Sequence, residues 1–332
     1  MNLSYENLMN HKISYFNIKD IASILDINLG LALVEQAYTL ISQGGIDSPS
    51  KISVFLPENS DCVKAWINAM PALIKTDNVV GQKWVSVCSN NSSKNLPTTI
   101  GTILLNDAIS GVPLAIIDGT YITHIRTGVS LAIGVKYFTD THLDELTLIG
   151  AGSEARTALL AISKIRNLKK IRLFDINPLN VQSLISELGE KLNAEFVICK
   201  SAEEASYGSK CVISCTTASE PVVYKQWCDP LAFISSLSGV RDIDLNIINS
   251  SQHIVFDRTE SAIKRIEALS NMHISKDKAV DLCDYIANNN QQPYLANDKG
   301  FTTYLPLGLG GVDVYIANYI YSNNNSLKQL NF

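Results

Sequence analysis

One short stretch of the sequence has the spacing that a bound dinucleotide requires. In LTLIGAGSEARTALLAI (146–162), Gly150, Gly152 and Ala155 form the pattern G-x-G-x-x-A directly after an apolar run. The first glycine permits a tight turn, the second leaves room for a pyrophosphate, and the alanine lets a helix pack closely on the strand. The phosphates then meet free backbone N–H groups at the positive end of that helix. The alternative is a doubly wound fold whose glycines serve only the turn.

A carboxylate closes the next apolar run, KIRLFDI (170–176). This residue, Asp175, comes about 20 residues after the glycine pattern, where an acceptor can bond both hydroxyls of a ribose. A 2′-phosphate would be repelled there, and no Arg or Lys follows in DINPLN (175–180). The sequence therefore predicts NAD rather than NADP as the cofactor.

Hydroxyl residues follow two later apolar runs. Thr216 lies in CTTAS (215–219), and Ser236 and Ser238 lie in SSLSG (235–239). Ligands of doubly wound sheets bind at the carboxyl ends of the strands, so these residues are candidate cofactor contacts. Each could equally do no more than end a strand.

Two cations and one acid could act on a substrate beside such a cofactor. Lys83 interrupts an apolar strand pattern in GQKWVS, and Arg126 interrupts an apolar helix in ITHIRTGVS. An arginine can clamp a carboxylate at two points or reach the cofactor phosphates. Asp242, in SGVRDID, could handle a proton or merely cap a turn. A solvated charge is the alternative for both cations.

The first third of the chain predicts an α+β domain. A helix is expected over 28–44, where apolar residues recur at helical spacing. Strands are expected over 51–57, 64–74, 82–89, 99–107 and 112–118. Short turns, such as Asn106-Asp107 and Asp118-Gly119, suggest that most of these strands pair antiparallel under a helical cover.

From about residue 122 the pattern changes to a long helix followed by apolar runs that alternate with helices. The runs cover 146–150, 170–176, 194–200, 210–216, 231–238 and 253–257. Such alternation indicates a parallel sheet covered on both faces. We therefore predict an α/β protein: a Rossmann-type NAD domain (126–305), and a substrate-binding and dimerisation domain (1–125 and 306–332). A final apolar helix within 304–322 is expected to return to the first domain.

Composition narrows the class of partner. The chain has 332 residues, 46% of them hydrophobic, and a net charge of −5. With no basic footprint, nucleic acid and anionic membranes are unexpected partners, and a small molecule is favoured. No apolar run reaches the roughly 20 residues of a membrane span. Seven cysteines without a C-x-x-C pair favour a reducing cytoplasm and give no reason to expect a metal.

Four segments together resemble the ornithine cyclodeaminase/mu-crystallin family. They are GQKWVSVCSNNSSKNLPTTIGTILLND, GVPLAIIDGTYITHIRTGVS, the GAGSEA loop with FDINP, and GLGGVDVYIANYIY. The resemblance runs from about residue 45 to 321. It implies a homodimer with an N-terminal substrate and dimerisation domain, a Rossmann NAD(P) domain and a returning C-terminal helix.

The resemblance also implies roles for individual residues. Lys83 matches the lysine that binds the substrate carboxylate, and Arg126 matches the arginine shared by substrate and diphosphate. The implied cofactor contacts are Thr98 or Thr99, Thr127, Ser153, Glu154, Asp175 and Thr216. Two positions depart from the cyclodeaminases: Lys51 stands where they have an early substrate-binding arginine, and Asp242 is displaced from their catalytic aspartate.

Three functions are therefore open. The segments KWVSVCSNNSSKN, VISCTTASEPVV and AFISSLSGVRD are similar to a family branch that oxidises N-(2-amino-2-carboxyethyl)-L-glutamate, releasing 2,3-diaminopropionate and 2-oxoglutarate. This favours an NAD-dependent dehydrogenase that acts on the C–N bond of an amino acid conjugate or an imino acid. The alternatives are an ornithine cyclodeaminase or ketimine reductase, and a non-catalytic NAD(P)H-binding protein like mu-crystallin.

Overall fold

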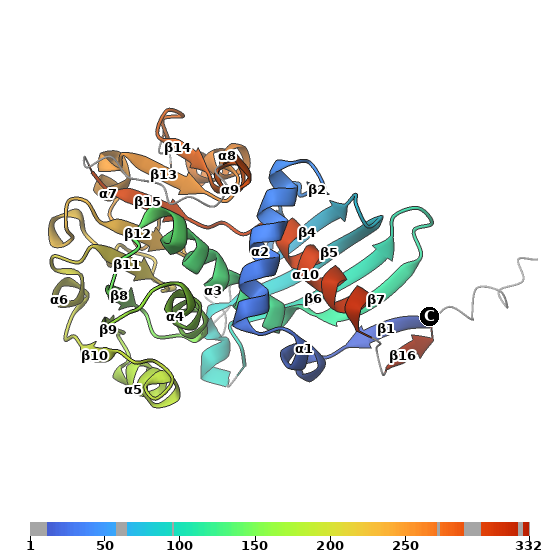
Figure 1. The fold of residues 1–332 in the computed structure, drawn as a ribbon, viewed down its shortest axis with the longest axis horizontal. Coiled ribbons are helices and arrows are strands. Elements are labelled where there is room, and N and C mark those ends of the chain that lie inside the picture. Colours follow the sequence, from blue (N-terminus) through green and yellow to red (C-terminus); the bar gives the residue numbers. More distant parts are fainter. Residues whose placement is uncertain are drawn as a thin grey trace, which may run out of the picture. The chain divides into compact units, whose positions relative to one another are not determined.

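The chain divides into two compact units. A computed structural model describes residues 12–57, 65–94, 96–270, 273–288, 300–324 and 328–331. Unit 1 comprises Met1–Arg126 and Leu309–Phe332, and unit 2 comprises Thr127–Gly308 (Figure 1). The boundaries expected from the sequence lay after residue 125 and before residue 306.

Unit 1 is built on a mixed sheet in the order β16-β1-β7-β6-β5-β4-β2, with β3 also paired to β4. Strands β4 to β7 form an antiparallel meander, while β1 joins β7 in parallel. The strands are β1 (Lys12–Phe16), β2 (Ile46–Asp47), β3 (Ile52–Phe55), β4 (Ala65–Ile74), β5 (Val79–Cys88), β6 (Thr99–Asp107), β7 (Pro113–Asp118) and β16 (Gln329–Asn331). The sequence pattern predicted five of them, all in the meander and its β3 extension.

Helices cover one face of this sheet. The C-terminal helix α10 (Gly310–Asn323) packs on β4, β5 and β6, and α2 (Ile27–Ser42) packs on α10 (Figure 1). A short helix, α1 (Ile18–Ile24), and a 3-10 turn, η2 (Ser89–Lys94), complete the unit. Glycines let α10 approach closely: a Cβ at Gly310 would lie 2.8 Å from the carbonyl oxygen of Met70.

The expected turn at Asp118-Gly119 is wrong. Helix α3 (Gly119–Phe138) starts there without a hairpin, directly after β7. The Asp118 carboxylate accepts hydrogen bonds from the backbone N–H groups of Thr120 (3.0 Å) and Tyr121 (3.2 Å). Asp-Gly is a common turn pair, but here the aspartate satisfies the free donors at a helix start, which the same residue type also does well.

Unit 2 is a doubly wound, all-parallel sheet of Rossmann type. Its strand order is β10-β9-β8-β11-β12-β15-β13-β14. The strands are β8 (Glu145–Ile149), β9 (Lys170–Phe174), β10 (Glu195–Ile198), β11 (Cys211–Ser214), β12 (Phe233–Ser236), β13 (His253–Phe256), β14 (Ala279–Asp281) and β15 (Thr302–Leu305). The order reverses at β8, so the topological switch point, where such folds bind their ligands, lies between β8 and β11.

The helices of unit 2 alternate with its strands. They are α4 (Ser153–Ile165), α5 (Pro178–Leu188), α6 (Ala202–Ser206), η3 (Lys225–Trp227), α7 (Leu245–Ser250), α8 (Thr259–Ser270) and α9 (Leu282–Asn288). The sequence indicated the first six strands of this sheet but neither β14 nor β15. Both are short, and β15 (TTYL) has too few apolar residues to form a run.

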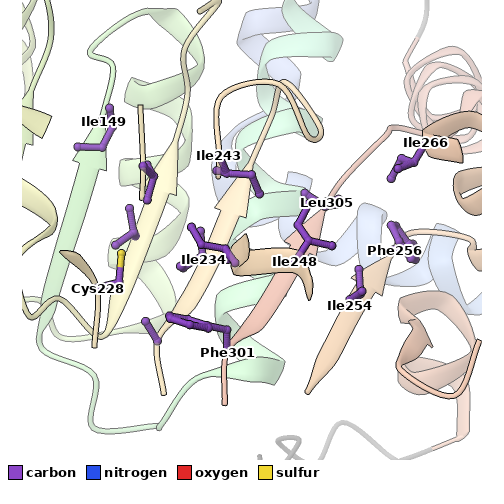
Figure 2. Packing of buried hydrophobic residues seen from close by; sticks show 14 of the residues in the cluster. Ile149, Cys228, Ile234, Ile243, Ile248, Ile254, Phe256, Ile266, Phe301 and Leu305 are labelled. Carbon is purple, nitrogen blue, oxygen red and sulfur yellow. The ribbon is translucent and has the colours of Figure 1, made fainter. Parts of the chain in front are cut away.

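A continuous layer of side chains joins the helices and strands of unit 2. Ile234 of β12, Leu305 of β15 and Phe256 of β13 lie in one cluster with Ile248 of α7 and Ile266 of α8 (Figure 2). Every residue of β11 and β12 is buried, including Ser214, Ser235 and Ser236. Central strands covered on both faces explain the near-continuous apolar runs in the sequence.

Within the described residues, no single helix is long and apolar enough to cross a membrane. Helices α1 and α2 meet the length and hydropathy criteria only when taken together, and they are bent by 87° at the break between them.

Candidate active site

Unit 1 holds a buried carboxylate between two cations. Lys83 Nζ lies 2.7 Å from Asp313 Oδ2, and Arg126 Nε lies 3.0 Å from Asp313 Oδ1. The side chains of Lys83 and Asp313 are fully buried, and that of Arg126 is 13% exposed. A cation thus lies at each oxygen of one buried carboxylate.

Three elements bring the cluster together. Lys83 lies on the buried face of β5, opposite the exposed Trp84. Thr123 of α3 donates its hydroxyl to the Gly119 carbonyl (2.6 Å) and lies 3.4 Å from Lys83 Nζ, so it accepts from the lysine. Asp313 comes from the first turn of α10, whose glycines allow the close approach to β4. Lys83 is therefore not a solvated charge, because it points into the packed side of a central strand.

The ion pairs keep Asp313 charged. Burial by itself would raise the pKa of this carboxyl group, but the Arg126 guanidinium and the Lys83 ammonium outweigh burial and hold the pKa below its ordinary value. The carboxylate is therefore ionised at neutral pH, and it anchors both cations.

Sequence reasoning missed Asp313. The pattern of its segment, GLGGVDVYIANYIY, predicts only an apolar helix. The available signal was the lone acid among apolar residues, because a buried carboxylate requires a partner.

The two glycines of the loop in unit 2 have different roles. One is required by the backbone conformation, and the other leaves space for a ligand. Gly150 has φ +89°, and a Cβ there would lie 2.6 Å from the Cys215 carbonyl oxygen. Gly152 has an ordinary φ of −78°, and a Cβ there would meet nothing within 4 Å. No side chain caps α4 at Gly152, and Ala155 is fully buried in the same helix. Open space beside an uncapped helix N-terminus fits a dinucleotide phosphate.

Asp175 links this loop to the next helix. One oxygen, Oδ2, accepts from the Ala151 N–H at 2.7 Å. The other, Oδ1, accepts from the Asn177 N–H (2.8 Å) and from Asn180 Nδ2 (3.2 Å). A carboxylate has about four acceptor sites, so this one can organise the loop and still bond a ribose hydroxyl. These features together fit NAD.

Asp242 lies in unit 2, and its carboxylate accepts hydrogen bonds from three hydroxyl groups. Its Oδ2 accepts from Ser214 Oγ (2.6 Å) and Thr216 Oγ1 (2.8 Å), and its Oδ1 accepts from Ser236 Oγ. The side chain is fully buried. The structure thus joins two predicted cofactor contacts, Thr216 and Ser236, to the predicted proton-handling acid. The catalytic role of Asp242 stays a prediction.

The other predicted site residues are distributed over both units. Lys51 directly precedes β3, Thr98 and Thr99 stand where β6 begins, and Thr127 is in α3. Ser153 and Glu154 form the start of α4, and the Ser238 N–H donates to Ser236 Oγ (3.2 Å) after β12. Their roles also stay predictions.

A Rossmann-type unit joined to a unit with a buried Lys-Asp-Arg cluster defines an NAD-dependent oxidoreductase of small molecules. The model of the ornithine cyclodeaminase/mu-crystallin family matches residues 15–328, so the chain belongs to this family. It is 26% identical to the alanine dehydrogenase of Archaeoglobus fulgidus over 317 residues, covering 92% of this chain and 93% of the relative.

Two solved structures have the same fold. One is Δ1-pyrroline-2-carboxylate reductase of Thermococcus litoralis in complex with NADH and L-proline, with TM-score 0.82 and 28% identity, covering 93% of this chain and 97% of the other. The second is an archaeal alanine dehydrogenase dimer with bound NAD, with TM-score 0.82 and 24% identity, covering 97% and 100%.

Replacing Asp313 with asparagine tests the buried cluster. We expect Asp313→Asn to lower the free energy of unfolding at pH 7 by about 3–5 kcal/mol, because it leaves buried cations without a counter-charge. Because the pKa of Asp313 is lowered in the folded state, its charge stabilises the fold fully above about pH 4. This stabilisation is lost as the pH falls through the pKa of the folded state. The difference in unfolding free energy between the variant and wild type therefore becomes smaller in acid. Urea unfolding at several pH values measures this difference in unfolding free energy.

Asp144→Asn is the matched control for this measurement. Asp144 also has a lowered pKa, because its carboxylate bonds Lys169, but this ion pair is exposed to solvent. We expect almost no change in stability. Equal effects of the two substitutions would contradict a special role for Asp313.

A pair of glycine substitutions tests the loop. Gly152→Ala should leave the unfolding midpoint unchanged and weaken NADH binding by about tenfold or more, because its methyl group enters only the space we assign to phosphate. Gly150→Ala should destabilise the fold, because its Cβ would strike the Cys215 carbonyl in a backbone conformation that favours glycine. Thermal unfolding and NADH fluorescence titration separate the two; full NADH affinity in Gly152→Ala would refute the phosphate assignment.

Proposed function

We propose that this protein is an NAD-dependent dehydrogenase that acts on the C–N bond of an amino acid conjugate or an imino acid. The observation that carries the proposal is the buried cluster of Lys83, Asp313 and Arg126. Family relatives are oxidoreductases of amino and imino acids, as with the alanine dehydrogenase and pyrroline-2-carboxylate reductase described above.

The cluster is suited to the carboxylate of such a substrate. The Arg126 side chain is 13% exposed, and its Nε donates to Asp313. A guanidinium matches a carboxylate in shape and charge. We assign Arg126 and Lys83 to hold the carboxylate, so that the α-carbon next to it has a fixed position.

NAD, when bound, supplies hydride transfer at that carbon. Gly152 and the N-terminus of α4 receive its diphosphate, and Asp175 bonds the ribose beside the glycine loop. The proton of the substrate nitrogen passes to water or to Asp242. Because Asp242 already accepts three hydroxyl bonds, we favour water for this transfer.

Two substrate classes have support. N-(2-amino-2-carboxyethyl)-L-glutamate is favoured by the motifs of residues 83–95, 212–223 and 232–242, and its several carboxylates would suit the cations Lys51, Lys83 and Arg126. A small cyclic imino acid is favoured by the 28% identity to a pyrroline-2-carboxylate reductase that was solved with NADH and L-proline.

An absorbance assay at the NADH band tests the function. The protein is supplied with NAD and N-(2-amino-2-carboxyethyl)-L-glutamate, with NAD and ornithine, or with NADH and pyrroline-2-carboxylate. We expect turnover with the glutamate conjugate or with the imino acid. Ornithine consumed without NADH accumulation would instead indicate a cyclodeaminase, and NADH binding without any turnover would indicate a non-catalytic protein.

A lysine substitution connects this activity to the cluster. Lys83→Ala should lower kcat/KM by about 100-fold or more while the Kd for NADH stays nearly constant, because the lysine serves the substrate and not the cofactor. Lys75→Ala is the control, since Lys75 makes only an exposed ion pair with Asp47 at 3.8 Å. Unchanged turnover in Lys83→Ala would contradict its assigned role.

We also propose that two copies pair through the open face of the unit 1 sheet. Side chains on this face include Ile52, Val54, Trp84, Ile100 and Leu104, which are 40–66% exposed. Pro71, Val80 and Gln82 line a shallow hollow beside Trp84 and Leu104. A large exposed apolar patch on a sheet is typical of an interface, and the alanine dehydrogenase described above was solved as a dimer.

Sedimentation measures the pairing. Wild type is expected to be a dimer, and the double substitution Trp84→Glu and Leu104→Glu a folded monomer, because two charges would be buried in the interface. Leu231→Glu is the control, as Leu231 is an exposed apolar residue of unit 2. A monomeric wild type, or a dimeric double variant, would refute this surface.

A cytoplasmic location is part of the proposal. Cys199, Cys211, Cys215, Cys228 and Cys283 are free thiols, and all of these except Cys215 are buried. Unpaired thiols fit a reducing compartment.

A further inference from the structure

Asp242 is a buried carboxylate that has no cationic partner among the described residues. Its side chain is fully buried, and none of the ion pairs among the described residues includes it. Its three donors, Ser214, Thr216 and Ser236, are neutral hydroxyls. The contrast with Asp313 is direct, because Asp313 has two cations at its oxygens. Hydroxyl donors stabilise a carboxylate but leave its negative charge uncompensated.

The position of this charge follows from the strand order. Ser214 ends β11 and Ser236 ends β12, so the Asp242 carboxylate lies at the carboxyl ends of two neighbouring strands. The glycine loop after β8 and Asp175 after β9 account for the diphosphate and the adenosine ribose on one side of the switch point. In a doubly wound fold the other half of the dinucleotide extends over the strands on the opposite side. Here these are β11 and β12, which places the nicotinamide half near Asp242.

The field of Asp242 acts on groups at this edge. Cys215 directly follows β11 and precedes Thr216. Burial, then the charges of Glu154 and Asp242, raise the pKa of the Cys215 thiol well above its ordinary value. The Asp242 carboxylate contributes to this shift by disfavouring a second negative charge close to it. The oxidised nicotinamide ring carries a positive charge that the reduced ring lacks, so a nearby carboxylate distinguishes the two.

We propose that the buried, hydroxyl-bound carboxylate of Asp242 sets the redox preference of the protein by strengthening the binding of NAD⁺ relative to NADH. The inference rests on the proposed use of NAD. It gives Asp242 an electrostatic role through the cofactor, with no proton transferred. The three hydroxyl donors hold the carboxylate in place and add no positive charge of their own.

The test measures two dissociation constants. NADH is titrated by its fluorescence, and NAD⁺ is titrated by displacement of NADH, for wild type and Asp242→Asn. At an effective dielectric constant of about 20, a unit charge within roughly 10 Å changes a binding constant by about tenfold. We therefore expect the ratio of the NAD⁺ constant to the NADH constant to rise about tenfold in Asp242→Asn. If this variant does not fold, Asp242→Ser is the second neutral variant, because its hydroxyl can join the network.

Two controls separate charge from structure. Ser214→Ala removes one bond to Asp242 but keeps the charge, so the ratio should stay at the wild-type value. Asp257→Asn neutralises another buried carboxylate of unit 2, which accepts from Tyr304 and Gly308 after β13, two strands beyond β12. The inference is overturned by an unchanged ratio in the folded Asp242 variant, or by equal shifts in the controls. A wild type that binds neither form of NAD would overturn the proposed function itself.

Discussion

A buried carboxylate between two cations is the constraint on which unit 1 depends. Lys83 is fully buried in the middle of the β5 register, where an ammonium without a partner would be expelled or neutralised. Its partner, Asp313, comes from the far end of the chain. The C-terminal helix must therefore return to the first unit, and the glycines at its start must let it lie close to β4. Fold and site are thus determined by the same contact.

The two units handle charge in opposite ways. In unit 1 two cations hold one buried carboxylate, and we assign these cations to the carboxylate of the substrate. In unit 2 the carboxylates Asp175 and Asp242 are held by neutral donors at the edge of the sheet. In our proposal the first group of charges binds an anionic substrate, and the second lies near the positively charged ring of the cofactor. The overall charge of −5 reveals neither.

Features of the fold that depend only on neighbouring residues could be predicted from local sequence patterns. The glycine loop, Asp175 and most strands could be found because each reflects the conformation or burial of one short segment. Asp118-Gly119 was misread because an Asp-Gly pair suits both a turn and a helix start. Strand β15 was missed because two of its four residues are threonines, so its sequence, TTYL, forms no apolar run.

Long-range partners could not be predicted in this way. Lys83 and Arg126 were found as cations out of place in apolar segments, but nothing near them in sequence points to Asp313. The hydroxyl groups around Asp242 likewise come from strands separated along the chain. Such contacts depend on the sheet order, which a single sequence specifies only through the complete fold.

A double-mutant cycle on Lys83 and Asp313 tests the central claim most directly. Unfolding free energies are measured for wild type, Lys83→Met, Asp313→Asn and the double variant. If the ion pair couples these side chains, the double variant is more stable than the sum of the single effects implies, by about 1–3 kcal/mol. Effects that add to within about 0.5 kcal/mol would show that the two residues act independently, and would contradict the account.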